Sequence, residues 1–310
     1  IMDAVNSLQD IRQLKSIGFK TIIYFLGGSF FAVSIGILLA NLVKPGIGFQ
    51  MPSTVDAVEV KELPGMYQTI LDLVPANPFE ALAKGEMMQV IVFSLFLGIA
   101  LMLVGKKAEP VQEAINTLSQ AMFKLIGIVL HIIPLGVFGL MTVAITRFGL
   151  KIFGPVLKFI LVDYAACLFM IVIMYSLALK FIAKVKIRDF WHYGIESFLV
   201  AFSTCTSSAA LPVAMKNSKR MGIPKEVGNF VLPLGATANM NGTCIYFGII
   251  VIFASQLYGV PLAFGQQVML AVTATLLSVA CAATPQIGLV ISITLLTSMG
   301  LPIEATALVA

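Results

Sequence analysis

The residues best suited to bind an ion or a polar solute lie within nine positions, 235–243, which read Gly-Ala-Thr-Ala-Asn-Met-Asn-Gly-Thr. Amide, hydroxyl and backbone oxygens are the hard ligands that cations such as Na⁺ favour. In hydrocarbon every backbone polar group needs an internal partner, and the flanking runs are apolar, so the tract belongs inside protein or against a cavity. Gly and Asn tolerate non-helical dihedral angles. We therefore predict a helix broken near mid-membrane, whose freed carbonyls hold a cation or a polar solute. The alternative is a continuous helix whose Asn and Gly residues only pack against neighbours.

The segments that position this tract are predicted to cross a membrane. Of the 310 residues, 59% are hydrophobic and 11% are charged, whereas about a quarter of the residues in soluble domains are charged. Long apolar runs predict transmembrane helices at 21–43, 87–105, 125–146 and 159–179. The expected fold class is an all-α polytopic membrane protein of the plasma membrane, which is the inner membrane in a bacterium. Residues 226–310 contain no Lys or Arg, and no basic face gathers stacking aromatics, so we expect no nucleic-acid partner.

Four further features of the first 180 residues give expectations about packing. Gly27, Gly28 and Ser29, at the centre of the first span, permit close helix approach. Residues 44–86 read as an external loop followed by short helical pieces. Residues 109–123 have helical spacing and are expected at the membrane interface. Asp163 lies one turn inside the fourth predicted span, where a functional role and simple interfacial solvation are both open.

Two more polar tracts have the pattern of re-entrant hairpins. The basic clusters at 180–188 and 216–225 lie on the cytoplasmic side by the positive-inside rule. The chain between them is too short to cross twice, and small polar residues at 203–210 interrupt its apolar run. A second copy of this pattern occurs at 266–300, where 278–285 interrupts an apolar run. Each tract alone also fits a serine-rich loop or a kinked helix, but two of them flanking a broken span favour a transporter with a midplane site.

These tracts together resemble the dicarboxylate/amino acid:cation symporter family, which is the glutamate-transporter-like, sodium:dicarboxylate group. The resemblance is carried by residues 207–212 (SSAALP), 239–243 (NMNGT) and 265–267 (GQQ). Four of five residues at 239–243 match the family's asparagine-methionine-aspartate-glycine-threonine signature. The likeness covers nearly the whole chain and implies the family's fold, with two re-entrant helical hairpins and a broken transmembrane helix. It also leads us to expect a fragment that lacks the family's first two spans and its last.

The resemblance implies a function and a domain organisation. It implies a secondary-active symporter that couples uptake of an amino acid or dicarboxylate to Na⁺ or H⁺ by an elevator mechanism, in a homotrimer surrounded by lipid. Residues 1–190 would be mainly scaffold and trimerisation spans, and residues 191–310 would be the core of the transport domain. For the spans at 21–43 and 159–179 the resemblance leaves open whether they also belong to the transport domain. The alternative is a truncated, transport-incompetent subunit with an assembly or interfering role. An enzyme is disfavoured because no nucleophile is paired with a base.

The resemblance also implies the site residues. The small anionic or zwitterionic solute would contact Cys205, Ser207, Ser208, Thr243, Thr284 and Gly288. The sodium ligands would be Gly235, Thr237, Asn239, Met240, Asn241, Ser278, Val279 and Cys281. Within this set, the backbone of Thr237 and Met240 with that of Ser278, Val279 and Cys281 would form one sodium site, and carbonyls of Gly235 and Asn239 would serve another.

The sequence departs from the family pattern at several of these positions. Asn241 stands where the signature has an aspartate. Phe25 and Gly28 stand where a tyrosine and a threonine would help a third sodium site, which leaves only Ser29. An amide offers a neutral oxygen where a carboxylate would balance the cation, so we expect this third site to be weak or lost. Cys205 replaces an arginine that some members carry in the first hairpin.

Overall fold

The computed structural model describes residues 17–48, 75–84, 87–130, 153–279, 287–302 and 304–309, together with isolated positions between 131 and 152. All regular elements among these residues are helices, which confirms the all-α fold class. Three helices are long and apolar enough to cross a membrane: Phe19–Val43, Phe153–Ala183 and Val227–Leu257. The third of these comprises two consecutive helices with the candidate site between them, and the first packs against it.

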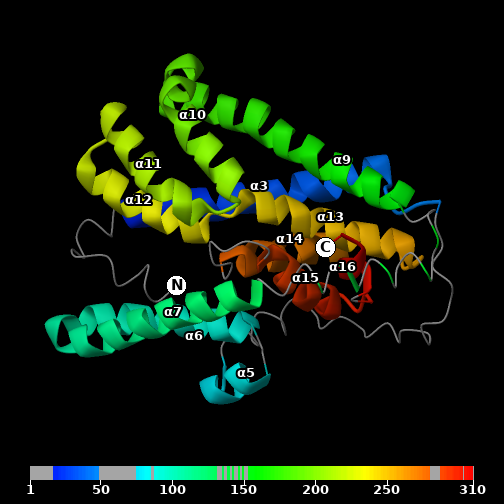
Figure 1. The fold of residues 1–310 in the computed structure, drawn as a ribbon, viewed down its shortest axis with the longest axis horizontal. Helices are drawn as coiled ribbons and strands as arrows, with labels where there is room; N and C mark the ends of the chain where they lie inside the picture. Colours follow the sequence, from blue (N-terminus) through cyan, green and yellow to red (C-terminus); the bar gives the residue numbers. More distant parts are fainter. Residues whose placement is uncertain are drawn as a thin grey trace.

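The helices follow one another along the chain as shown in Figure 1. They are α3 (Phe19–Val43), α5 (Pro78–Lys84), α6 (Met87–Val104), η2 (Gly105–Ala108), α7 (Glu109–Leu130), α9 (Phe153–Phe169), η4 (Met170–Tyr175), η5 (Ala178–Ala183), α10 (Ile187–Thr204), α11 (Ser207–Arg220), α12 (Lys225–Ala238), α13 (Asn241–Leu257), α14 (Phe264–Val279), α15 (Ile287–Ser298) and α16 (Glu304–Val309). The predicted spans at 21–43 and 87–105 coincide with α3 and α6 to within two residues.

Two predicted boundaries were wrong. The expected interfacial helix at 109–123 and the start of the span at 125–146 form one helix, α7, because Lys124 between them is a good helix former. Most of 131–146 lies outside the described residues. The span predicted at 159–179 is a helix from Phe153 to Ala183, because Lys158 and Lys180 end the uncharged run but, as good helix formers, do not end the helix. Asp163 therefore lies ten residues after the start of this helix, about 15 Å along it at 1.5 Å per residue.

The core is organised around α13, which packs mainly on α3 and also contacts α9, α14 and α15. Most α13 side chains are buried. The α3–α13 contact is close because of two glycines: a Cβ atom at Gly36 would lie 2.5 Å from the carbonyl oxygen of Ile245, and one at Gly248 would lie 2.7 Å from that of Val33. The close approach predicted for Gly27, Gly28 and Ser29 is confirmed for the last two, since a Cβ atom at Gly28 would lie 3.5 Å from Asn241 Nδ2 and the buried Ser29 hydroxyl donates to Asn241. A Cβ atom at Gly27 meets nothing within 4 Å.

Two pairs of consecutive helices flank α12 and α13. The helices α10 and α11 pack on each other, and α11 also packs on α12; in Figure 1 the three gather on one side of α3. The helices α14 and α15 also contact each other, and both contact α13. Whether either pair is re-entrant in a membrane stays a prediction, as do the domain boundaries. The residues of 44–86 that the structure describes include one short helix, α5.

Candidate ion and solute site

The predicted break in the polar tract is present. Helix α12 ends at Ala238 and α13 begins at Asn241. Between them Asn239 has φ −115° and ψ 74°, and Met240 has φ −100° and ψ 58°, well away from helical values. The N–H of Asn239 donates to the Gly235 carbonyl at 3.1 Å, and that of Cys244 to the Met240 carbonyl at 2.9 Å. Both of these predicted sodium ligands therefore already accept one backbone hydrogen bond, and each keeps a second lone pair.

The break sets two helix ends of opposite polarity against each other. The last carbonyls of α12 and the first N–H groups of α13 have no partner within their own helices. A helix carries a partial negative charge at its C-terminus and a partial positive charge at its N-terminus. A cation is therefore favoured at the α12 end, near Thr237 and Asn239, and an anion at the α13 end, near Thr243. One broken helix thus offers complementary charges to an ion and to a carboxylate.

Asn239 adds a side-chain oxygen to the α12 end. Its Oδ1 atom is buried and has no hydrogen-bond partner among the described residues. Buried polar atoms nearly always have a partner, so an exception calls for an explanation such as an ion. The chemistry of this atom, a neutral hard oxygen, suits Na⁺. The sequence-based assignment used only the backbone carbonyl of Asn239.

Asn241 is held by hydrogen bonds at both ends of its amide. The Ser29 hydroxyl donates to Asn241 Oδ1 at 3.2 Å, and Asn241 Nδ2 donates to the Tyr175 hydroxyl at 2.8 Å. Ser29 is fully buried and Asn241 is 7% exposed. The position predicted for a third sodium ion is thus filled by a neutral, satisfied network. Tyr175 was missed from the sequence, where its only signal was a hydroxyl within an apolar span.

The aromatic ring of Phe25, one turn before Ser29 on α3, packs against α12. A Cβ atom at Gly235 would lie 3.1 Å from Phe25 Cζ, so the glycine lets the ring pack directly on the helix backbone. Phe25 itself is buried. At this position α3 therefore presents an apolar ring to α12 and supplies no oxygen ligand.

The second helix pair reaches the break. A Cβ atom at Gly288, in the first turn of α15, would lie 3.0 Å from Thr243 Cγ2. Ser278, fully buried near the end of α14, donates to the Thr275 carbonyl at 2.7 Å and lies beside the Cys244 thiol. Val279 is the last residue of α14. The predicted ligands Cys281 and Thr284 lie outside the described residues.

The first helix pair presents its polar turn to solvent. Cys205 ends α10 in a left-handed conformation with φ 51°. Thr206 caps α11, and its hydroxyl accepts a hydrogen bond from the Ser208 N–H at 3.3 Å. Cys205, Ser207 and Ser208 are exposed. The structure therefore brings Ser278, Gly288 and the α12–α13 residues together, and leaves the three residues of the first pair uncovered.

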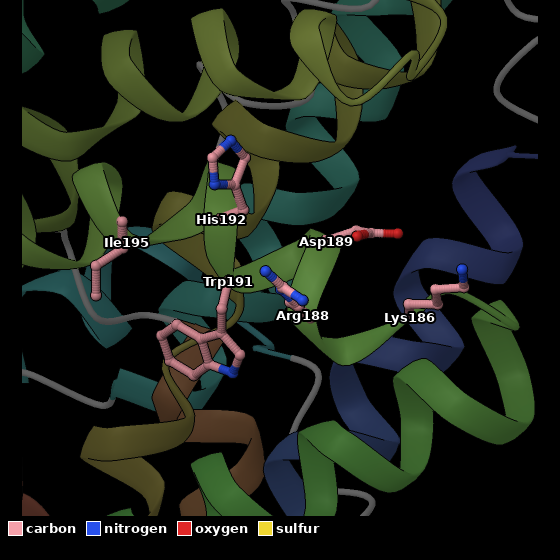
Figure 2. A pocket seen from close by; sticks show the side chains of 6 residues that line it. All are labelled: Lys186, Arg188, Asp189, Trp191, His192 and Ile195. Carbon is pink, nitrogen blue, oxygen red and sulfur yellow. The ribbon is translucent and has the colours of Figure 1, made fainter.

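A hollow at the start of α10 is separate from the candidate site. Figure 2 shows its lining, which consists of Lys186, Arg188, Asp189, Trp191, His192 and Ile195. It contains none of the predicted site residues. Basic and Trp side chains together are typical of a membrane–water interface.

The fold and the break together define a helical membrane protein with a membrane-spanning helix interrupted at a polar tract. The comparison with known families agrees: residues 1–310 match the sodium:dicarboxylate symporter family, and the chain belongs to that family. The protein is thus a cation-coupled symporter rather than an enzyme, and a multi-pass protein of the plasma membrane, which is the inner membrane in a bacterium.

Individual relatives cover almost all of this chain. It is 32% identical over 314 residues to a proton/sodium-glutamate symport protein of Geobacillus stearothermophilus, a match that covers 99% of this chain and 74% of the relative. It is 33% identical over 313 residues to a proton/glutamate-aspartate symporter of Escherichia coli, covering 97% and 71%. It is 31% identical over 282 residues to C4-dicarboxylate transport protein 1 of a Bradyrhizobium species, covering 90% and 64%.

Proposed function

We propose that this protein takes up a small dicarboxylic solute, either an acidic amino acid or a C4 dicarboxylate, together with Na⁺ or H⁺. The observation that carries the proposal is the break at Asn239 and Met240, which faces the first turn of α15 at Gly288. Support for the solute class comes from the relatives, which are named as glutamate, aspartate and C4-dicarboxylate transporters.

The charges at the break explain why solute and cation bind together. A carboxylate of the solute lies at the positive end of α13, where the Thr243 hydroxyl donates to it, with Ser207 and Ser208 of the α11 turn as further donors. A hydrogen bond to a charged group contributes about 1.5–3 kcal/mol, whereas removing the ion from water costs several kcal/mol. The solute alone is therefore bound weakly. A cation at the α12 end supplies the missing attraction, which makes each ligand raise the affinity of the other.

The oxygens around the break limit how many sodium ions take part. Thr237, Asn239 and the carbonyls of Gly235 and Met240 serve one or two Na⁺ sites with Ser278 and Val279 of α14. The neutral network of Ser29, Asn241 and Tyr175 leaves no carboxylate for a further ion. The protein therefore uses fewer sodium ions than a family member with aspartate at position 241.

The movement that carries the solute is an elevator movement of a rigid transport body. The helices α3, α9 and α13–α16 share one buried core, and α12 contacts α3 and α14, which supports their moving together with the break inside them. The α14–α15 pair acts as the gate, because the missing side chain at Gly288 lets it close on Thr243. The body slides against the remaining spans of a homotrimer.

Uptake into liposomes tests this function. The purified protein is reconstituted, and radiolabelled L-glutamate, L-aspartate and succinate are offered under an inward Na⁺ gradient, an inward H⁺ gradient or neither. At least one solute should accumulate above its external concentration when a cation gradient is present, and only equilibrate without one. The variant Gly288→Val, which forces a side chain against Thr243, should abolish accumulation, whereas Gly265→Ala, where a Cβ atom meets nothing within 4 Å, should not. Accumulation no greater than in protein-free liposomes for all three solutes would refute the proposal.

A further inference from the structure

An acidic side chain lies inside the membrane-spanning body but outside the site described so far. Asp163 is on α9, and its Oδ1 atom is buried without a hydrogen-bond partner among the described residues. The ion pairs among the described residues, Lys84–Glu80 and Arg220–Glu196, do not involve it. An unpaired charge inside a membrane is costly, and such acids are usually functional. A carboxylate avoids this cost by binding a proton, which makes it neutral.

The surroundings of Asp163 link it to the candidate site. Phe159 and Asp163 are one turn apart on α9, on the face that meets α13, where the Phe159 ring packs edge-on against Tyr246 at 5.9 Å. Tyr246 and Cys167, which is one turn further along α9, are near enough to Asp163 for a charge on its carboxyl group to act on them. The Tyr246 hydroxyl is also buried without a hydrogen-bond partner among the described residues, and it lies near Ser292 of α15. Two buried oxygen atoms without a hydrogen-bond partner among the described residues, Asp163 Oδ1 and the Tyr246 hydroxyl oxygen, thus lie at the α9–α13 contact.

The same tyrosine touches the gate. A Cβ atom at Gly288 would lie 4.0 Å from Tyr246 Cδ1 and 3.0 Å from Thr243 Cγ2. Tyr246 therefore stands between Asp163 and the α13–α15 contact where the solute is proposed to bind. Two tyrosines on the helices around α9 have other partners: Tyr175 of η4 hydrogen-bonds with Asn241, and Tyr24 of α3 lies near Tyr175. No basic side chain of the described residues forms an ion pair with Asp163, so nothing among them holds it as a carboxylate.

We propose that Asp163 is a proton-binding site that couples H⁺ to the solute movement at the α12–α13 break. The inference rests on the proposed function and names its proton-coupled ion site. With the gate open, water reaches the carboxylate and one proton transfers from hydronium to an oxygen of Asp163, leaving water and a neutral acid. The neutral acid permits the α9–α13–α15 contact to close and the body to move in the membrane. On the other side the proton returns to water as the gate opens.

The variant Asp163→Asn separates proton coupling from solute movement, because the amide mimics the protonated acid and cannot release a proton. In liposomes without Na⁺, an inward gradient of about one pH unit supports an about tenfold accumulation of L-glutamate or succinate for each coupled proton. D163N should lose this accumulation, falling to about equal concentrations, while exchange of internal for external solute continues and becomes independent of pH. The matched control is Asp189→Asn, an exposed aspartate on α10, which should behave as the unchanged protein. D163N that still accumulates solute about tenfold would overturn the proposal.

Infrared spectroscopy tests the proton site without requiring transport. In protein labelled with ¹³C-aspartate, a protonated carboxyl band should appear and disappear as the pH is varied through the physiological range. The variant Asp163→Glu should move this band to the unlabelled glutamate position. A labelled carboxyl band that is absent, or unaltered by D163E, would overturn the assignment even where D163N fails to fold. If the unchanged protein shows the band but transports none of the probe solutes, the proposed function fails and the proton site stands.

Discussion

At the scale of single residues, the neutral amide of Asn241 decides the cation chemistry of the break. Its consequence for a third sodium site could be predicted from the sequence, because an amide and a carboxylate differ in charge whatever surrounds them. The hydrogen-bond partner of the amide could not be predicted, because Tyr175 lies 66 positions away and no local pattern relates the two residues. The same holds for Asn239. Its residue type indicated a ligand, but the burial of its Oδ1 atom could not be predicted because it depends on helices far apart in the sequence.

Asn241→Asp should restore a cation site. The new carboxylate, buried beside Ser29 and Tyr175, requires a positive partner, since an unpaired buried charge costs several kcal/mol. The Hill coefficient for Na⁺ in solute uptake should rise by about one, as one further ion gains a ligand. The thermal midpoint of the variant in detergent should fall without Na⁺ and recover with it. Asn229→Asp, at an exposed position on α12, serves as the control, and equal sodium Hill coefficients for N241D and the unchanged protein would contradict the account.

At the scale of elements, the break itself was the most predictable feature. Gly, Asn and Thr gathered in an apolar run leave few other structures open, and the structure separates α12 from α13 at that point. The contact that holds α13 was not predictable. Gly27 and Gly28 are adjacent and stand out in the sequence, whereas the isolated Gly36 and Gly248 make the close backbone contact, because the register between two helices is set by all of their packing together.

Gly36→Ala and Gly248→Ala should therefore destabilise the protein. The added methyl groups meet backbone carbonyls at 2.5 and 2.7 Å, which cannot rotate away as side chains do, so each variant should lose about 1–3 kcal/mol, the usual cost of overpacking. Thermal unfolding in detergent, followed by cysteine-reactive fluorescence, measures the loss. Gly27→Ala places the same methyl group in open space and should leave the midpoint unchanged or raise it. A midpoint for G36A equal to that of G27A would show that the α3–α13 contact is drawn wrongly.

At the scale of the whole molecule, composition alone placed the protein in a membrane and excluded a soluble fold. The family followed from three short motifs, and the match over residues 1–310 confirms it. The ends of α7 and α9 could not be predicted from the sequence, because hydropathy marks where a helix enters lipid rather than where the helix ends. The first helix pair also differs from expectation, since its polar turn is exposed while the second pair packs on α13.

The proposed assembly is a homotrimer, and native mass spectrometry from detergent or lipid nanodiscs measures it. Exposed apolar side chains recur at helical spacing on α7, at Leu118, Met122, Leu125 and Ile128, which provides a face for lipid or for another subunit. We expect the mass of three protomers as the main species. A single-protomer mass retained in several mild detergents and in nanodiscs would contradict the trimer.

The central claim is that the solute binds where α13 begins, against α15, and the accessibility of Thr243 tests this most directly. In a protein with Cys205→Ser, the variant Thr243→Cys is treated with a membrane-impermeant thiol reagent, with and without the transported solute and its cation. At about ten times the dissociation constant only about one tenth of the sites stay empty, so the alkylation rate should fall about tenfold when both ligands are present, and little with either alone. An alkylation rate that does not change, in liposomes that still accumulate the solute, would place the binding site elsewhere in the molecule.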